Sequence, residues 1–390
     1  MIKICIVSAI RSDYDLLAPI IKKMNRDKDF EVKLVVTGAH MSPEFGLTYK
    51  NIEQDGIVIH KKIEMLLSSD TPCGISKSMG MAMMGFGEYF SENEFDVLMV
   101  LGDRYETLAV CCAAMNARIP IIHLYGGETT QGAIDESVRH AISKMSNLHF
   151  TSTKEYRDRV IQMGESPDRV YCVGAMGVEN VMNTPLMSRD ELSKSLDMDL
   201  CNPYALVTFH PVTLENNSSQ EQITELLKIF DKLKCMQFVV TLANADADGR
   251  VINKMVEEYA RTHKNVHVYA SLGMVRYLSA IKYSECVIGN SSSGLIEVPS
   301  FKIPTINIGD RQKGRIQAES VINCEPNYDS MLRAINMAMS DSFKKNINNV
   351  VNPYGDGNTS EKVIEIIKQH KDKFNLKKKF YDIPFCLEDK

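Results

Sequence analysis

A short stretch of the chain concentrates groups that can exchange protons. Residues 123–140 read HLYGGETTQGAIDESVRH and include Glu128, Asp135 and His140. They follow the run 118–122, which resembles a short buried strand. Clustered carboxylates raise one another's pKa, so that one can hold a proton near neutral pH while its neighbour accepts one. The stretch therefore predicts one wall of an active site, although a polar loop before a capped helix is the simpler alternative.

Two further carboxylates follow apolar runs. Asp13 comes shortly after the run 2–9, and Asp103 follows 97–102, where Gly102 lets the backbone turn sharply. Each aspartate alone could be an ordinary helix cap. Three consecutive elements that deliver carboxylates to one edge of a sheet are harder to explain as caps, and they favour catalysis.

The second half of the sequence carries groups suited to a diphosphate. Residues 289–297 read GNSSSGLIE, a glycine- and serine-rich turn that leads into a helix. Backbone N–H groups at a helix start, with the hydroxyls of Ser291 and Ser292, can bind phosphate oxygens, and Glu297 can bind a ribose diol. A capped helix without a ligand is the alternative. Neither GxxxxGK[ST] nor GxGxxG occurs there, so a Walker loop and a nicotinamide cofactor have little support.

Other polar groups follow the remaining strands of this half. His210 ends the run 205–210 and is a candidate phosphate donor or proton carrier. Arg311, in GDRQKGR, offers a cation to an anion, and Asn244, in LANADADG, can meet a base or a sugar. One half thus favours a nucleotide diphosphate and the other an acid–base wall, a division that suits a nucleotide sugar.

The elements that must position these groups alternate along the chain. Short, almost continuously apolar runs predict parallel strands covered on both faces. With amphipathic helices between them, they indicate an α/β fold with two Rossmann-like domains facing a central cleft. Strands are predicted at 2–9, 31–38, 97–102, 120–125, 148–153, 170–175, 205–210, 237–243, 266–271, 286–291 and 305–309, and helices at 16–24, 106–116, 136–144, 218–234, 249–262, 273–282 and 293–299.

The periodicity weakens near 177–204, where we place the join between the domains. The first domain is predicted at 1–178 and the second, which holds the nucleotide, at 200–359. The amphipathic segment SEKVIEIIKQH predicts a final helix, at about 360–378, that packs back on the first domain.

Composition excludes several classes of protein. The 390 residues are 44% hydrophobic and 24% charged, with a net charge of −5, which gives no reason to expect a nucleic-acid or membrane partner. The ten cysteines lack a CxxC pair or zinc spacing, so we expect no metal. Reduced cysteines, with neither a signal-peptide core nor a membrane-length apolar run, predict a cytoplasmic protein.

The motifs GDRYE, HLYGGE…GAIDESVRHAISK, FHPVT, IGNSSSGLIEVPS and INIGDRQKGR together resemble a known family. They are similar to the hydrolysing UDP-N-acetylglucosamine 2-epimerases of bacterial sialic-acid synthesis and to the epimerase half of the animal bifunctional enzyme. The resemblance runs from about residue 2 to YDIPF near the C-terminus. It implies a glycosyltransferase-B-like fold and anti elimination of UDP to a glycal. Water then adds to give free N-acetylmannosamine, for sialic acid and surface polysaccharide, with no cofactor.

The resemblance also implies roles for individual residues and a homo-oligomer, either a dimer or a tetramer. Together with the motifs themselves, it leads us to expect catalysis by Asp103, Asp135, Glu128 and His210, binding of UDP and its phosphates by Arg11, Asp13, Asn244, Ser291, Ser292, Glu297 and Arg311, and sugar contacts from Arg104 and His140. Animal and non-hydrolysing members have a catalytic glutamate directly before the position of Gly126, where this chain has Tyr125. We infer that Glu128 or the Asp103 and Asp135 pair takes over its acid–base role.

Three alternatives remain at this point. The same reaction could use UDP-N,N′-diacetylbacillosamine, since sugar-pocket side chains decide that choice. A retaining glycosyltransferase would share the two-domain plan but would need an acceptor. A non-catalytic nucleotide-sugar sensor is the third, and the three acids argue against it because binding an anion does not favour them.

Overall fold

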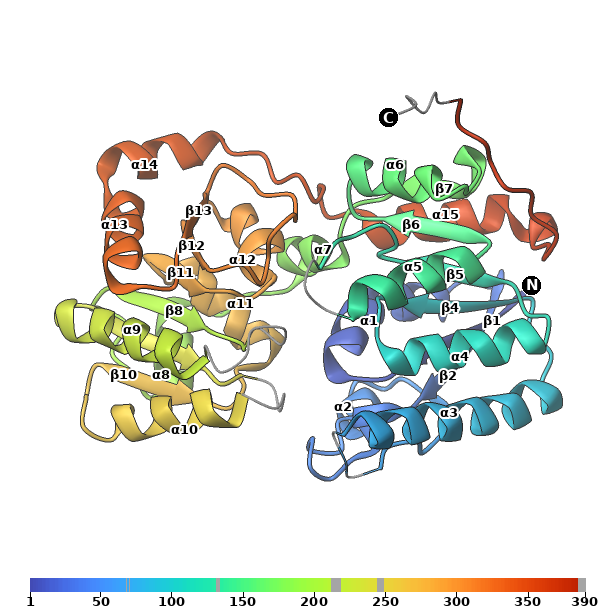
Figure 1. Cartoon of the computed structure of the whole chain (residues 1–390), viewed down its shortest axis with the longest axis horizontal. Coiled ribbons are helices and arrows are strands. Elements are labelled where there is room, and N and C mark those ends of the chain that lie inside the picture. The colour runs from blue at the N-terminus through green and yellow to red at the C-terminus, as the bar shows by residue number, and fades with distance from the viewer. Residues whose placement is uncertain (68, 70, 131–133, 212–218, 244–248, 385–390) are drawn as a thin grey trace, which may run out of the picture. The chain divides into compact units, whose positions relative to one another are not determined.

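The computed structural model describes residues 1–67, 69, 71–130, 134–211, 219–243 and 249–384 of the chain. The chain forms two compact units (Figure 1). Unit 1 comprises Met1–Glu128, Ile134–Glu179 and Gly355–Lys390, and unit 2 comprises Thr129–Ala133 and Asn180–Tyr354. Each unit is an α/β structure built on one parallel sheet, which confirms the predicted fold class.

Unit 1 is built on seven parallel strands in the order β3-β2-β1-β4-β5-β6-β7. All strands predicted in the first half are confirmed, whereas β3 was missed because three of its four residues are exposed and form no apolar run. The strands are β1 (Ile2–Ser8), β2 (Phe30–Val36), β3 (Ile59–Lys62), β4 (Val97–Leu101), β5 (Ile121–Leu124), β6 (Leu148–Thr151) and β7 (Val170–Cys172).

The helices of unit 1 connect these strands. They are α1 (Arg11–Met24), α2 (Tyr49–Gln54), α3 (Pro72–Glu92), α4 (Tyr105–Asn116), α5 (Asp135–Met145), α6 (Lys154–Gln162) and α15 (Thr359–Gln369), with α7 (Met176–Asn183) at the passage into unit 2 and the 3-10 turns η1 (Gly38–Met41), η2 (Pro167–Arg169) and η5 (Lys371–Lys373). The helix predicted for about 360–378 thus ends at Gln369.

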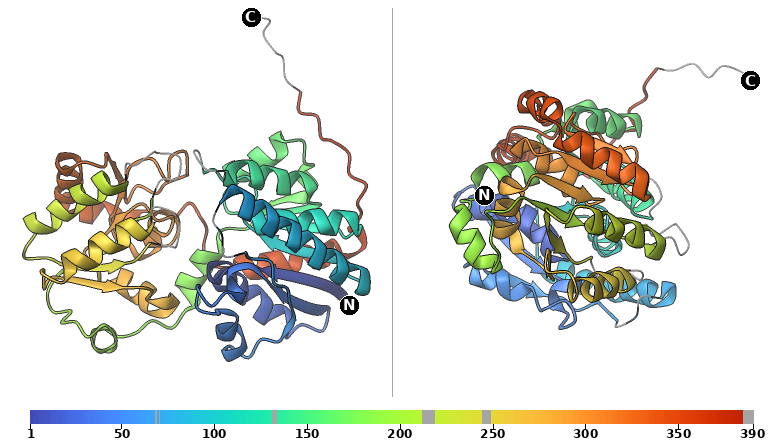
Figure 2. Two further views of the ribbon diagram at one scale, coloured as in Figure 1. Left: turned by 60° about the horizontal axis from the view of Figure 1, so that its bottom comes forward. Right: turned by 90° about the vertical axis from the view of Figure 1, so that its left-hand side faces the viewer.

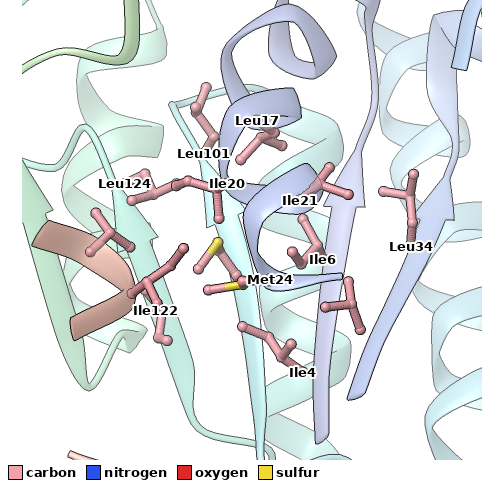
Figure 3. Close-up of a cluster of buried hydrophobic side chains, with 14 of the residues drawn as sticks. Ile4, Ile6, Leu17, Ile20, Ile21, Met24, Leu34, Leu101, Ile122 and Leu124 are labelled. Carbon is pink, nitrogen blue, oxygen red and sulfur yellow. The ribbon is translucent and has the colours of Figure 1, made fainter. Parts of the chain in front are cut away.

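The core of unit 1 shows why α1 forms where it does (Figure 3). Leu17, Ile20, Ile21 and Met24 recur at helical spacing, and all four are buried against the sheet. Their partners on β1, β4 and β5 include Ile4, Ile6, Leu101, Ile122 and Leu124. This packing holds the start of α1, and with it Asp13, at the carboxyl end of β1.

Unit 2 repeats the plan with six parallel strands in the order β10-β9-β8-β11-β12-β13. Its predicted strands are confirmed, and β13 was missed because none of its residues is fully buried. The strands are β8 (Tyr204–Thr208), β9 (Gln237–Thr241), β10 (Val266–Tyr269), β11 (Cys286–Gly289), β12 (Thr305–Ile308) and β13 (Val321–Cys324). The helices are α8 (Arg189–Leu196), α9 (Ser219–Lys232), α10 (Gly249–Ala260), α11 (Gly273–Tyr283), α12 (Ser293–Ile296), α13 (Tyr328–Met339) and α14 (Asp341–Asn346), with η3 (Val298–Phe301) and η4 (Ile347–Asn349).

Both sheets are covered on both faces (Figure 2). In unit 1, Ile4 and Ile6 pack with one set of helices while Cys5 and Val7 pack with another. In unit 2, strand β8 likewise divides its side chains between two buried clusters. Because the strands of each sheet are parallel, the loops after them gather at one edge, where ligands of such folds bind.

Candidate active site

Strands β1, β4 and β5 are neighbours in unit 1, so the turns that follow them lie at one edge of the sheet. The turn after β4 carries Asp103 and Arg104, and the segment after β5 carries Glu128 and leads to Asp135, the first residue of α5. Asp13 lies in the first turn of α1. The structure thus brings together the carboxylates that the sequence singled out in the first half.

A buried arginine organises this edge. Arg139 of α5 is only 1% exposed and forms an ion pair with Asp103. Its Nη1 also donates to the backbone oxygen of Glu128 and to Oε2 of Glu136, both at 2.9 Å. A guanidinium with several partners is an effective anchor, because its donors are fixed in one plane. Arg139 therefore fixes the Asp103 carboxylate relative to the turn after β5, a role that sequence reasoning did not assign.

Asp135 and Asp103 influence each other. The pKa of Asp135 is raised, first by burial and then by the negative charge of Asp103, against the opposing charges of Arg104 and Arg139. A carboxyl group with a raised pKa holds its proton more readily and is suited to donate it. Of these two acids, Asp135 has the character of the proton donor.

Asp13 is not the helix cap that the simpler alternative offered. The N-cap of α1 is Ile10, and no side chain caps that helix end. Asp13 is buried instead, and burial raises its pKa to about 7, with Arg104 opposing and Glu106 assisting the shift. The edge therefore holds, besides Asp135, a second carboxyl group whose pKa is raised.

Arg104 owes its orientation to Glu106, which sequence reasoning missed. Glu106 is 1% exposed, and its two carboxylate oxygens accept from Nε and Nη2 of Arg104 at 3.1 and 2.9 Å. Such a bidentate pair fixes the plane of the guanidinium. The pattern GDRYE contains this pair, but an acid two residues after an arginine is too common a signal to reveal it.

Glu128 and Tyr125 both serve the packing of unit 1. Glu128 is 4% exposed, and its carboxylate accepts from the hydroxyl of Ser152 at 2.7 Å. Tyr125 adopts a positive φ of 68°, and its hydroxyl accepts from the backbone N–H of Met176 at 2.8 Å. This enclosed position favours a supporting role for Glu128, and leaves Asp103 and Asp135 as the better candidates for proton transfer.

The buried His123 of β5 also supports this edge. Its Nε2 lies 2.8 Å from the backbone oxygen of Gly102, and its Nδ1 lies 3.1 Å from the hydroxyl of Ser143. A carbonyl only accepts, so Nε2 carries the hydrogen and Nδ1 accepts from Ser143. Burial lowers the pKa of His123 to about 3, and the neutral ring thus acts as a fixed brace behind Asp103.

The remaining two candidates of unit 1 lie on helices. Arg11 begins α1 and forms an ion pair with Asp15 at 3.5 Å. His140, on α5, contacts Glu136 at 3.5 Å, and its buried Nδ1 has no hydrogen-bond partner among the described residues. Both side chains are partly exposed, as residues that contact a ligand must be.

In unit 2 a single amide joins two of the predicted groups. Asn290, which is 1% exposed, accepts from the backbone N–H of His210 at 2.7 Å and donates Nδ2 to the backbone oxygen of His210 at 2.8 Å. Its own backbone oxygen accepts from Arg311 Nη1 and from Gln312 Nε2, each at 2.9 Å. Asn290 therefore brings His210 and Arg311 to one place at the carboxyl end of β11.

His210 is held neutral in this place. Burial, and then the charge of Arg311, lower its pKa to about 3. Its Nδ1 is buried and has no hydrogen-bond partner within the described part of the chain. A buried polar atom without a partner marks a position where a ligand or water completes the hydrogen bonding. His210 thus suits a hydrogen-bonding role better than that of a cationic phosphate ligand.

A serine-rich turn joins β11 to α12. Gly289 has a φ of 140°, and a Cβ there would lie 1.9 Å from the backbone oxygen of Thr208, so only glycine fits. Ser291 and Ser292 are partly exposed, and Glu297 follows α12 as its C-cap. Tyr277, which sequence reasoning missed, is partly buried beside this turn, and burial raises its pKa to about 12.

Asn244 lies outside the described residues. No group of three or more His, Cys, Asp or Glu side chains placed to hold a metal ion occurs in the described ranges. No helix found among these residues has the length and apolar character that crossing a membrane requires.

Comparison with known proteins finds a matching family model and similar sequences. A family model of UDP-N-acetylglucosamine 2-epimerase matches residues 22–368. The chain is 43% identical over 347 residues to GDP/UDP-N,N′-diacetylbacillosamine 2-epimerase (hydrolyzing) of Campylobacter jejuni, covering 88% of this chain and 89% of that protein. It is 40% identical over 388 residues to polysialic acid biosynthesis protein P7 of Escherichia coli, covering 99% of both.

The fold is also shared with solved structures. The crystal structure of UDP-GlcNAc 2-epimerase from Neisseria meningitidis bound to UDP-GlcNAc matches with a TM-score of 0.81. The match covers 94% of this chain and 100% of that chain at 16% identity, so it supports the fold.

Proposed function

This chain belongs to the UDP-N-acetylglucosamine 2-epimerase family, in its hydrolysing branch, and from that premise we propose that it cleaves a UDP-linked 2-acetamido sugar with inversion at C2. The products are UDP and a free sugar, N-acetylmannosamine when the substrate is UDP-N-acetylglucosamine. The observation that carries the proposal is the pair of interacting carboxylates, Asp103 and Asp135, at the carboxyl edge of the unit 1 sheet.

In the first step Asp103 removes the proton from C2 as the bond between C1 and the diphosphate oxygen breaks. The electron pair of the C–H bond forms the C1=C2 double bond of a glycal, and UDP leaves with the electrons of the C–O bond. Asp103 suits this step because Arg139 holds it in place at the sheet edge. General-base assistance of this kind contributes a factor of about 10²–10⁴ to the rate.

In the second step Asp135 delivers a proton to C2 on the opposite face and the oxygen of a water molecule bonds to C1, while the proton that this water loses returns to the Asp135 carboxylate. Asp135 is the proton donor because its raised pKa keeps a larger protonated fraction than an ordinary aspartate has. The groups around Asn290 stabilise the leaving diphosphate. Arg311 supplies a positive charge, neutral His210 a hydrogen bond, and the turn at Ser291 its hydroxyls and backbone N–H groups.

Two substrates fit this chemistry. UDP-N-acetylglucosamine is our first proposal, supported by the family model and by the relative named for polysialic acid biosynthesis, which matches over 99% of both chains. UDP-N,N′-diacetylbacillosamine is the second, because the relative named for that substrate is 43% identical. The proposed product of the first substrate serves sialic-acid synthesis.

The proposal is tested by assaying both nucleotide sugars side by side with the purified chain, water as the only acceptor, and a chelator in one arm. We expect UDP and a C2-inverted free sugar to appear in equal amounts from one of the two substrates, with and without the chelator. Release of UDP from neither substrate would contradict the proposal. Release of UDP only after an acceptor sugar is added would also contradict it, and would favour a glycosyltransferase.

A further inference from the structure

A polar depression lies in unit 2 beside the residues assigned to the diphosphate. It occupies about 340 Å³ at the carboxyl ends of β12 and β13. Carboxamides, carboxylates and one ammonium group line it, contributed by Asn307, Asn323, Gln317, Asp310, Glu325 and Lys313. The proposed reaction assigns none of these side chains a role.

The base of the depression is a hydrogen-bonded chain of amides. Asn307 and Asn323 are paired across β12 and β13, and Asn307 Nδ2 donates to Asn323 Oδ1 at 2.8 Å. Asn323 Nδ2 donates in turn to Gln317 Oε1 at 2.7 Å, and Gln317 Nε2 returns to Asn323 Oδ1 at 3.2 Å. These bonds fix the amide planes before any ligand arrives, which lowers the cost of binding.

One acceptor in this chain has no partner. Asn307 is 3% exposed, and its Oδ1 is buried without a hydrogen bond from any residue that the structure describes. Leaving a buried carbonyl oxygen unsatisfied is unfavourable, so the position calls for a molecule that brings an O–H or N–H donor. An acceptor-only group such as phosphate cannot satisfy it.

The charges of the lining also disfavour an anionic ligand. Lys313 is already paired with Asp310 at 2.7 Å, and Glu325 adds a second carboxylate. A lining with two carboxylates and one ammonium repels anions. A volume of about 340 Å³ is at the lower end of small-molecule sites, which matches a monosaccharide rather than a nucleotide.

We propose that this depression is a second ligand site, which takes an uncharged, monosaccharide-sized molecule rich in hydroxyl and N–H donors, such as a free N-acetylated hexosamine. Asn307 accepts from the ligand, while Asn323 and Gln317 present further amide groups beside it. The same loop carries Arg311 and Gln312, which bond to Asn290, so the ligand binds against the back of the loop that serves the diphosphate.

The test is a binding titration of the full chain with N-acetylmannosamine and its C2 epimer N-acetylglucosamine, followed by saturation-transfer-difference NMR. The choice of these probes rests on the proposed function, but no nucleotide sugar is present, so a failure of that function leaves the test intact. We expect saturable binding of at least one epimer that Asn307→Leu weakens about tenfold, the loss of one good hydrogen bond to a buried acceptor.

A second variant and a control locate the site. Gln317→Ala, on the rim, should weaken sugar binding at least threefold. This variant tests the proposed site even if Asn307→Leu fails to fold. Asn202→Ala removes an exposed amide that precedes β8 and should leave binding unchanged. Absence of saturable binding of both sugars overturns the proposal. So does binding that Asn307→Leu and Gln317→Ala leave intact while Asp135→Asn abolishes it.

Discussion

Asp13 shows how burial changes the chemistry of a single residue. Its pKa is raised from 3.8 to about 7, first by burial. Because the folded-state pKa lies above the unfolded value, Asp13 favours the folded state least at high pH, and stability is lost as pH rises from about 4 to about 7. We expect Asp13→Asn to stabilise the protein by roughly 2–4 kcal/mol at pH 8 and by little at pH 4, measured by urea unfolding.

The matched control for Asp13 is Asp329→Asn, which alters an exposed aspartate in the first turn of α13. That change should affect stability equally at both pH values. An Asp13→Asn variant whose unfolding free energy differs from wild type by the same amount at pH 4 and pH 8 would show that Asp13 titrates normally.

Asn290 allows a second prediction at this scale. Its amide bonds twice to the backbone of His210, and its backbone oxygen receives Arg311 and Gln312. Asn290→Asp keeps the shape but removes the Nδ2 donor and adds a negative charge next to the diphosphate site. We expect UDP affinity, measured by calorimetry, to fall about tenfold or more.

Asn265→Asp is the control for Asn290, because Asn265 also bonds a backbone oxygen, that of Met236, but lies before β10 at the amino edge of the sheet. It should bind UDP as wild type does. Equal UDP affinity in Asn290→Asp and wild type would show that Asn290 does not support UDP binding.

At the scale of elements, prediction from sequence worked where burial and periodicity agree. Strands β4 and β8 are wholly buried, β1 is buried except for Lys3, and all three were found from their apolar runs. The long helix α3 was missed, since its many methionines and glycines blur the helical pattern although Ala82, Phe86 and Phe90 are buried at helical spacing.

The partners of the side chains in the loops were harder to predict from the sequence. The motifs pointed to Asp103 and Asp135, but the contacts of Arg139 with Asp103 and of Asn290 with His210 join segments that lie far apart in the chain. A sequence pattern does not contain that information, because each of these side chains has many neighbours that could have served equally well.

The ionic contacts of Glu165 lead to a prediction about the pH dependence of stability. Glu165, between α6 and η2, is 2% exposed and receives His149 of β6, Lys144 of α5 and Lys378 of the C-terminal segment. Burial alone would raise the pKa of Glu165, but these partners hold it at about 2. Because the folded-state pKa is depressed, the contribution is present above about pH 4.5 and lost as pH falls toward about 2.

We therefore expect Glu165→Gln to lower the free energy of unfolding by about 3 kcal/mol at pH 7, since it leaves Lys144 and Lys378 without their carboxylate and weakens the contact with the buried His149. The difference from wild type should shrink as the pH is lowered below 4.5. Glu155→Gln, an exposed position on α6, is the control and should be neutral. A Glu165→Gln deficit that stays constant down to pH 2 would refute the assignment.

At the scale of the whole molecule, the proposed chemistry divides between the two units. In our proposal the carboxylates that handle a proton at C2 come from unit 1, and the cation, the neutral histidine and the hydroxyls for the leaving group come from unit 2. The composition gave no electrostatic reason to expect nucleic-acid binding, and it did not predict how the chemistry divides between the units. That division was predicted from the motifs. The choice between the two candidate sugars depends on side chains that no motif marks.

The central claim, elimination and hydration at C2 with Asp103 as the base, is tested most directly by turnover of UDP-N-acetylglucosamine in deuterium oxide. We predict UDP and N-acetylmannosamine that carries one deuterium at C2, and an Asp103→Asn variant that binds UDP normally but turns over at least about 10³-fold more slowly. Product that retains its original hydrogen at C2 would contradict the account.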